Sequence, residues 1–314
     1  PAVFNMVVAN VIRGEGYSLH AGLGLSLGGV LNIALDPFFV LPFGLNMNIK
    51  GAAIATLISN VVTTLYFAIL LIVIRKKSVV SFSPKKACLA IKEKIARNVL
   101  FTGLPSALQT MLSAVSNLVL NSLMIGYGET AEAAIGVTKK IDAVPFGMVT
   151  GLAQGAAPLI AYNNGAKKYD KMKTTLKLSL CYCVGLAITV LIVVESAAGA
   201  LIEVFIKDAS TVTYGEKFLR LHCASLPFMA VTFMLVSYFQ AVGAKGKAFL
   251  LSIIRKGIVD IPLMYLLNVV IPVYGIVACQ PITDVISATV GVILYVLWKK
   301  KFQKTEEEQE IIVQ

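Results

Sequence analysis

Long apolar blocks alternate with short charged or turn-rich connectors along the whole chain. Most blocks reach the roughly 20 residues that a helix needs to cross the hydrocarbon core of a bilayer. They predict a partial helix at 1–12 and complete spanning helices at 19–43, 50–74, 98–126, 131–162, 176–206, 214–242, 247–271 and 275–298. The short alternating segments of a transmembrane barrel are absent, so the pattern predicts an all-α polytopic membrane protein.

Basic residues gather in every second connector. They occupy Arg13 to His20, 75–97, Lys167 to Lys173, Lys245 to Lys247 and Lys299 to Lys301, and the connectors between these are poor in cations. Short basic loops stay on the cytoplasmic side during membrane insertion. We therefore expect a multi-pass protein of the inner (plasma) membrane with a cytoplasmic carboxy terminus.

The longest basic connector predicts a division into two helical bundles, or lobes. We expect the carboxy-terminal part of a first lobe at 1–74, a cytoplasmic linker at 75–97, a second lobe of six helices at 98–300 and a charged cytoplasmic tail at 301–314. A weak internal repeat relates 12–77 to 241–301, which is typical of the pseudo-symmetric lobes of secondary transporters. Since the second lobe has six predicted helices, we expect the first lobe to be incomplete in this sequence.

Composition excludes a soluble protein. Hydrophobic residues make up 57% of the chain and charged residues 14%, and the mean hydropathy is +0.80. Soluble domains carry about a quarter charged residues. The net charge of +11 lies mostly in the connectors, where it orients the helices, so we expect the lipid bilayer and no nucleic acid as a partner. The five cysteines lack metal-ligand spacing, and no cofactor motif is present.

Asp36 is the most informative single residue, because it lies deep in the predicted span 19–43. An ionisable group at that depth is costly unless it faces a partner or a cavity. Asn32 lies one turn earlier on the same helical face, and Thr56 in the next span could approach it. Their oxygen atoms suit Na⁺, or a carboxylate that takes up H⁺. The alternative is that Asp36 lies near the outer surface, beside the helix-kinking Pro37.

Polar residues in the second lobe predict a substrate cavity. Its candidate residues are Gln109, Asn117, Asn121, Asp142, Gln154, Asp260 and Asp284. Asp260 and Asp284 lie in the last two predicted spans and are candidates for one polar cluster. Lys139 and Asp142 share a helical face, so either a buried ion pair or a contact between Asp142 and a cationic substrate fits the spacing. Glu216, Arg220 and His222 lie near the outer start of their span and are interpreted as interfacial.

Two glycine patterns predict close helix packing. Gly147, Gly151 and Gly155 form a small-residue stripe on one face of the span 131–162. Gly24 and Gly28 flank Ser26 in a G-x-S-x-G pattern, but a catalytic serine of that type needs a strand-to-helix elbow. The pattern lies inside a predicted spanning helix, so we interpret it as packing and expect no enzyme.

Several short motifs occur in one order over most of the chain. They are Arg13-Gly-Glu-Gly16, Asn32-Ile-Ala-Leu-Asp36-Pro37, Gly51-Ala-Ala-Ile-Ala-Thr56, Lys140-Ile-Asp142, Gly151-Leu-Ala-Gln154, Gln240-Ala-Val-Gly243 and Gln280-Pro281. Together they resemble the multidrug and toxic compound extrusion (MATE) family, in particular its bacterial multidrug branch. Although each motif alone is weak, their shared order makes the resemblance specific.

The resemblance implies an antiporter with two lobes of six helices each. Members of the family exchange Na⁺ or H⁺ for cationic or amphipathic drugs, need no cofactor beyond the coupling ion, and are expected here as a monomer. The resemblance also implies that Asn32, Asp36 and Thr56 hold the cation, with a possible Na⁺ at Asp36. An aspartate of the family's first helix completes that site and is not in this sequence.

Two other functions are compatible with the sequence. A lipid-linked oligosaccharide flippase of related architecture would need more arginine in its cavity, whereas we expect this cavity to be poor in cations apart from Lys139 and Lys140. A polytopic membrane enzyme or assembly factor would need a catalytic histidine, cysteine or carboxylate pair at membrane depth.

Overall fold

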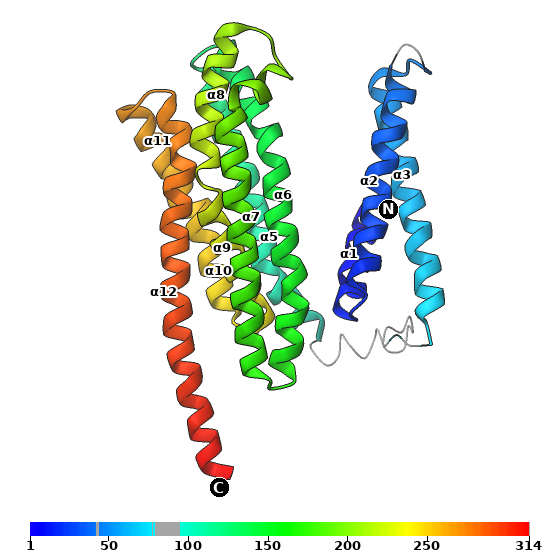
Figure 1. Cartoon of the computed structure of the whole chain (residues 1–314), viewed down its shortest axis with the longest axis vertical. Coiled ribbons are helices and arrows are strands. Elements are labelled where there is room, and N and C mark those ends of the chain that lie inside the picture. Colours follow the sequence, from blue (N-terminus) through cyan, green and yellow to red (C-terminus); the bar gives the residue numbers. More distant parts are fainter. Residues whose placement is uncertain (42–43, 77, 79–94, 314) are drawn as a thin grey trace. The chain divides into compact units, whose positions relative to one another are not determined.

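The computed structural model describes residues 1–41, 44–76, 78 and 95–313, with side chains only as far as residue 300. The chain forms two compact units, Pro1–Lys94 and Ile95–Gln314, which are described separately. Most of the predicted linker 75–97 and the side chains of the predicted tail 301–314 lie outside the described residues. The described elements are helices, as the apolar pattern predicts (Figure 1).

The first unit has three helices, α1 (Ala2–Gly14), α2 (Ser18–Val40) and α3 (Asn48–Ile74). The three helices pack against one another around an apolar cluster that includes Val8, Ile12 and Phe67. The predicted helices 1–12, 19–43 and 50–74 are confirmed within a few residues. The second of them ends early, because Leu41 precedes a proline and adopts an extended conformation with ψ 155°.

Glycines allow α2 and α3 to approach closely. A Cβ atom at Gly24 would lie 2.6 Å from the ring of Phe67, and one at Gly28 would collide with the hydroxyl of Thr63. The prediction that these two glycines serve packing is confirmed. Since Gly24, Gly28 and Asn32 are each one turn apart on α2, the close contact also brings Asn32 against α3.

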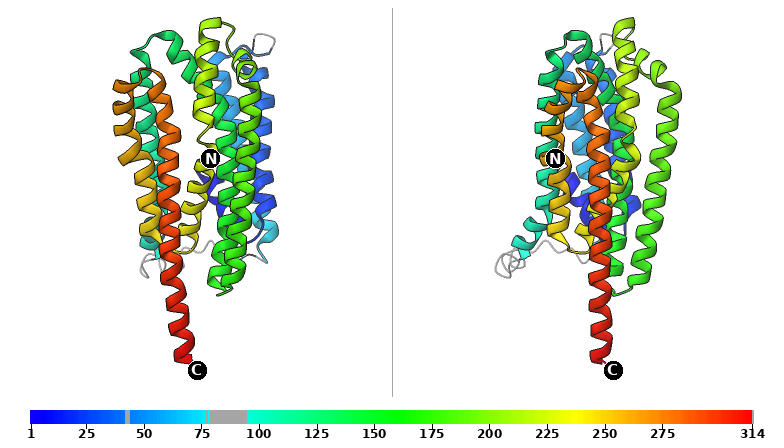
Figure 2. Two further views of the ribbon diagram at one scale, coloured as in Figure 1. Left: turned by 60° about the vertical axis from the view of Figure 1, so that its left-hand side comes forward. Right: turned by 90° about the vertical axis from the view of Figure 1, so that its left-hand side faces the viewer.

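The second unit contains nine helical segments. They are α5 (Ile95–Ile125), α6 (Glu129–Gly165), α7 (Tyr169–Glu203), α8 (Ala209–Cys223), α9 (Leu226–Ala241), α10 (Lys245–Ile253), the π-helix η1 (Ile254–Val259), α11 (Asp260–Val270) and α12 (Tyr274–Val313). Helices α6, α7 and α9 pack together, α11 and α9 lie against α12, and α10 lies against α5 (Figure 2).

Two predicted spans are not continuous helices. The span 214–242 is divided into α8 and α9, which are bent by 42° at a break followed by a proline in the first turn of α9. The span 247–271 is divided into α10, η1 and α11. In the described part of the chain, six helices are long and apolar enough to cross a membrane, or seven with α8–α9 counted as one. The predicted span 247–271 is outside this number, because its helical stretch is divided into α10, η1 and α11 and contains Arg255, Lys256 and Asp260.

Apolar side chains cover much of the outer surface of both units. In the most apolar segment of each spanning helix, no more than 28% of the residues are buried within the described structure. Large apolar side chains such as Leu118, Ile192 and Val269 are exposed. Contiguous apolar surface of this extent mixes well with lipid and poorly with water, so the helices are arranged as expected for a polytopic membrane protein.

Candidate cation and substrate sites

The three predicted cation ligands of the first unit lie together. The amide nitrogen of Asn32 donates to Asp36 Oδ1 at 3.3 Å and approaches Thr56 Oγ1 at 3.4 Å. The hydroxyl of Thr56 in turn donates to the carbonyl of Ala52 at 2.8 Å. A carboxylate, an amide and a hydroxyl from two helices are therefore held within one cluster, which has the oxygen chemistry that a hard cation or a proton requires.

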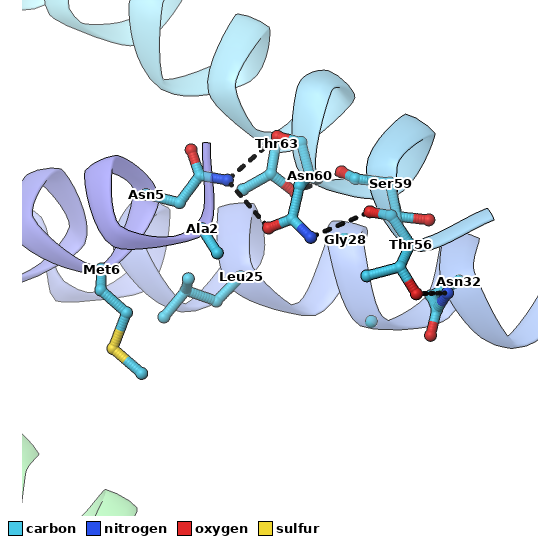
Figure 3. A pocket seen from close by; sticks show the side chains of 11 residues that line it. Ala2, Asn5, Met6, Leu25, Gly28, Asn32, Thr56, Ser59, Asn60 and Thr63 are labelled. Atoms are coloured by element: carbon cyan, nitrogen blue, oxygen red, sulfur yellow. Dashed lines mark hydrogen bonds between the residues drawn. The ribbon is translucent and has the colours of Figure 1, made fainter. Parts of the chain in front are cut away.

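A pocket of about 300 Å³ adjoins this cluster. Its polar lining comes from α1, α2 and α3 and consists of Asn5, Asn32, Thr56, Ser59, Asn60 and Thr63 (Figure 3). Asp36 does not line the pocket itself, but it accepts a hydrogen bond from Asn32, which does. The pocket is therefore a largely apolar space into which these polar groups are set, and it borders Asn32 and Thr56 of the cluster.

Asn5 is a polar contact that the sequence analysis missed. Its side chain is buried in α1, donates to the Asn60 carbonyl at 3.0 Å and accepts from Thr64 Oγ1 at 2.8 Å. It ties α1 to the polar face of α3. The available signal was one asparagine in an otherwise apolar segment, since a buried amide needs a partner.

The second unit contains a buried network of two cations and two carboxylates. Arg255 Nε donates to Asp284 Oδ1 at 2.6 Å, and these side chains are 2% and 0% exposed. Lys256 Nζ lies 3.0 Å from Asp260 Oδ2 and donates to Gln280 Oε1 at 2.8 Å. Two further bonds close the network, from Ser116 Oγ to Asp260 at 2.6 Å and from Gln280 Nε2 to Asp284 at 2.9 Å. The network joins α5, η1, α11 and α12.

This network corrects one expectation. We expected few cations at membrane depth in the second unit apart from Lys139 and Lys140, but Arg255 and Lys256 also lie there. The signal was a pair of basic residues within the apolar segment 247–271. Asp260 and Asp284 belong to one polar cluster, in which both are almost fully buried and ion-paired. Their contact with substrate stays a prediction.

Lys139 and Asp142 do not form the ion pair that their spacing allowed. Lys139 Nζ donates to Asn117 Oδ1 at 2.5 Å. Asp142 Oδ1 instead faces Nδ1 of His222 at 3.6 Å. The side chain of His222, which we interpreted as interfacial, is buried, because α8 packs against α6.

The other predicted cavity residues differ in their exposure. Gln109 is buried, and its amide nitrogen has no hydrogen-bond partner in the described structure. Asn121 and Gln154 are exposed. A Cβ atom at Gly147, Gly151 or Gly155 would meet no atom of the described structure within 4 Å, so the predicted packing partner of this stripe is not found in the second unit. Close packing depends on what a neighbouring helix presents, and a glycine stripe alone does not supply it.

A comparison with family models identifies the chain. The MatE family model matches residues 105–266, which is just over half of the sequence. This chain belongs to the MATE family. The match covers the region from α5 to α11, and it confirms the resemblance that the short motifs indicated.

Relatives of this MATE chain extend the match to nearly its whole length. The multidrug export protein MepA of Staphylococcus saprophyticus is 29% identical over 302 residues, which cover 96% of this chain and 65% of that protein. MepA of Staphylococcus haemolyticus is 27% identical over 98% of this chain and 66% of that protein. The chain thus spans about two-thirds of the length of these relatives. They are named for export rather than for catalysis, which does not support the alternative of a membrane enzyme.

A solved structure agrees with the fold of this MATE chain. The outward-facing conformation of a multidrug resistance MATE family transporter has a TM-score of 0.85 and 26% sequence identity, and covers 96% of this chain and 67% of that chain. The chain is therefore a multi-pass α-helical membrane protein. No group of three or more histidine, cysteine or acidic side chains placed to bind a metal ion occurs in the described residues.

Proposed function

We propose that the protein is a secondary active antiporter, which exports cationic or amphipathic small molecules in exchange for Na⁺ or H⁺. The observation that carries this proposal is the cluster of Asn32, Asp36 and Thr56 between two apolar helices. Membership of the MATE family and the export function in the names of the relatives support it. Alternating access would expose this cluster to the two sides of the membrane in turn.

The chemistry of coupling follows from the charge of Asp36. A carboxylate at membrane depth is stable when a cation or a proton neutralises it, and costly when it is bare. Asn32 and Thr56 are neutral, so they position the carboxylate without neutralising it. An incoming Na⁺ or H⁺ can therefore occupy the site, and its departure on the other side makes the empty carboxylate unfavourable until another cation binds.

The flippase alternative has less support. Arg255 lies beside Asp284 and Lys256 beside Asp260, so neither of these two basic side chains presents an uncompensated charge to an anionic lipid headgroup.

We also propose that the basic connectors, including Lys167 and Lys168 between α6 and α7, face the cytoplasm.

The test is transport by Asp36→Asn in the whole protein. This change keeps the shape of the side chain and removes its charge, so we expect normal abundance in the membrane and loss of gradient-driven efflux of ethidium. A coupling free energy of about 1–3 kcal/mol corresponds to a loss of about 5–150-fold. Asn32→Ala removes a neutral partner and should have a smaller effect.

The measurement is dye transport in everted vesicles, with an imposed H⁺ gradient and an imposed Na⁺ gradient applied separately. Asp170→Asn is the matched control, since Asp170 is a fully exposed aspartate in the first turn of α7. Unchanged transport by Asp36→Asn under both gradients would show that Asp36 is structural.

A further inference from the structure

Lys139 is a membrane-depth cation of the second unit that has no carboxylate in contact with it. It lies ten residues after Glu129, the first residue of α6, and therefore about 15 Å along the helix. Its ammonium group has no acidic side chain within ion-pair distance in the part of the chain that the structure describes, whereas Arg255 and Lys256 each lie beside an aspartate. A charged side chain at this depth normally faces a partner or a cavity, so Lys139 indicates a binding site.

The two carboxylates that act electrostatically on Lys139 are held by other side chains. They belong to Asp260 and Asp142, and Lys256 acts on Lys139 as a second positive charge. Asp260 accepts a hydrogen bond from Lys256 at 3.0 Å, and Asp142 Oδ1 faces His222 on α8 at 3.6 Å. The charges around Lys139 therefore balance in number, but neither carboxylate makes contact with its ammonium group.

Lys139 and Asn117 form a pair of hydrogen-bond donors that a ligand can reach. Lys139 Nζ donates one hydrogen bond to Asn117 Oδ1 on α5 at 2.5 Å. Because an ammonium group can only donate, the amide presents its oxygen to Lys139 and leaves its nitrogen free to donate elsewhere. That nitrogen makes no hydrogen bond in the described structure, and Asn117 is exposed while Lys139 is half-buried. The remaining N–H groups of both side chains are therefore available.

This pair of donors fits one carboxylate. The two oxygens of a carboxylate accept from neighbouring donors, and its negative charge gives Lys139 a charge-assisted hydrogen bond. A lipid phosphate is a poor source of this charge, because it lies outside a hydrocarbon core about 30 Å thick. Asn117 lies eight residues before Ile125 at the end of α5, about 12 Å inside the helix. Asn121, one turn further along α5 and also exposed, adds a neutral amide to the same face.

We propose that Lys139 and Asn117 bind the carboxylate of exported zwitterions, which are amphipathic molecules that carry a carboxylate as well as a cationic group. The proposal names a substrate class of the proposed antiport function and rests on that function for export, but not for binding. Asp142 lies three residues further on the same face of α6, so its negative charge favours the cationic end of such a molecule. A molecule with a cationic group alone gains this second attraction and is repelled by Lys139.

The test compares two dyes that differ in one group. Rhodamine B carries a carboxylate and a cationic ring system, and its ethyl ester keeps the cation without the carboxylate. Their affinities for the whole protein in phosphatidylcholine nanodiscs are measured by fluorescence anisotropy, without any ion gradient. In Lys139→Gln, the affinity for rhodamine B should fall about tenfold or more, which is the loss expected for a hydrogen bond to a charged group, and the affinity for the ester should not fall.

Three more variants isolate the role of the two donors. Lys139→Arg keeps the charge and should retain the binding of rhodamine B. Asn117→Asp gives Lys139 an internal carboxylate, so it should weaken the binding of rhodamine B and not of the ester, and it decides the question if Lys139→Gln does not fold. Lys177→Gln removes an exposed lysine of α7 and is the matched control, so it should change neither affinity.

Equal losses for both dyes in Lys139→Gln, or undiminished binding of rhodamine B in Lys139→Gln or Asn117→Asp, would overturn the proposal. A parent protein that does not bind rhodamine B would also overturn it, and competition by added phosphatidylglycerol would assign the donors to a lipid headgroup instead. Dye transport in proteoliposomes separates this proposal from the antiport function. If rhodamine B binds through Lys139 but neither dye is exported under an H⁺ or Na⁺ gradient, the antiport function fails and the carboxylate site stands. If the ester is exported and Lys139→Gln binds rhodamine B as the parent does, the site fails and the antiport function stands.

Discussion

Replacement of Asp284 by asparagine tests the most deeply buried ion pair of the second unit. The change leaves the Arg255 guanidinium buried without its carboxylate, and removal of one partner of a buried pair costs about 3–5 kcal/mol. Two features reduce this cost. The asparagine oxygen can still accept one hydrogen bond, and the guanidinium lies over the ring of Phe233 at 4.7 Å, a contact worth about 2 kcal/mol when desolvated. We therefore expect a loss of about 3 kcal/mol, or roughly a hundredfold in the folding equilibrium.

The assay is reversible unfolding of the whole protein in mixed micelles, for the parent, Asp284→Asn, Arg255→Gln and the double variant. If the two groups stabilise each other, the double variant should lose less than the sum of the single losses. A double replacement by Met at Arg255 and Leu at Asp284 should recover most of the stability, because apolar pairs often replace buried ion pairs at little cost. Asp170→Asn serves as the exposed control. Additive losses, or an Asp284→Asn variant as stable as the parent, would refute the reasoning.

Three further predictions concern packing, topology and pH. Gly28→Val should separate α2 from α3 and lower the free energy of unfolding by about 1–3 kcal/mol, whereas Gly22→Ala, which meets no atom within 4 Å, should not. In intact cells, an impermeant thiol reagent should label a single cysteine at Thr130 and spare one at Lys168; the reverse would contradict the orientation. Asp208 caps α8 by accepting hydrogen bonds from the hydroxyls of Ser210 and Thr211 and from the Thr211 N–H, which together lower its pKa to about 2. This stabilisation is fully present above pH 3.8 and is lost as pH falls through about 2, so the melting difference between Asp208→Ala and the parent should vanish there.

The spanning helices could be predicted because their signal is local. The length and composition of each apolar block are enough to predict its helix. The spacing of four residues between Asn32 and Asp36 is likewise enough to place both on one helical face. The spans of Asp260 and Asp284 suggested a polar cluster, but their partners in the second-unit network could not be predicted in this way. Its partners are distant in sequence, with a separation of 29 positions from Arg255 to Asp284 and of 144 positions from Ser116 to Asp260. The division of the segment 247–271 into α10, η1 and α11 accompanies these contacts, and π-helical turns are frequent at functional positions.

The acidic residues at membrane depth divide into two groups by their partners. In the second unit, Asp260 and Asp284 each lie against a basic side chain at 3.0 Å or less, so an external cation would have to displace an internal one. Asp142 faces a histidine, whose charge depends on a proton. Asp36 differs from all three, because its hydrogen bond in the described structure comes from a neutral amide and no basic group lies within ion-pair distance. Exchange of a cation at Asp36 therefore requires no internal ion pair to break, and this is the physical reason to seek the main coupling step in the first unit.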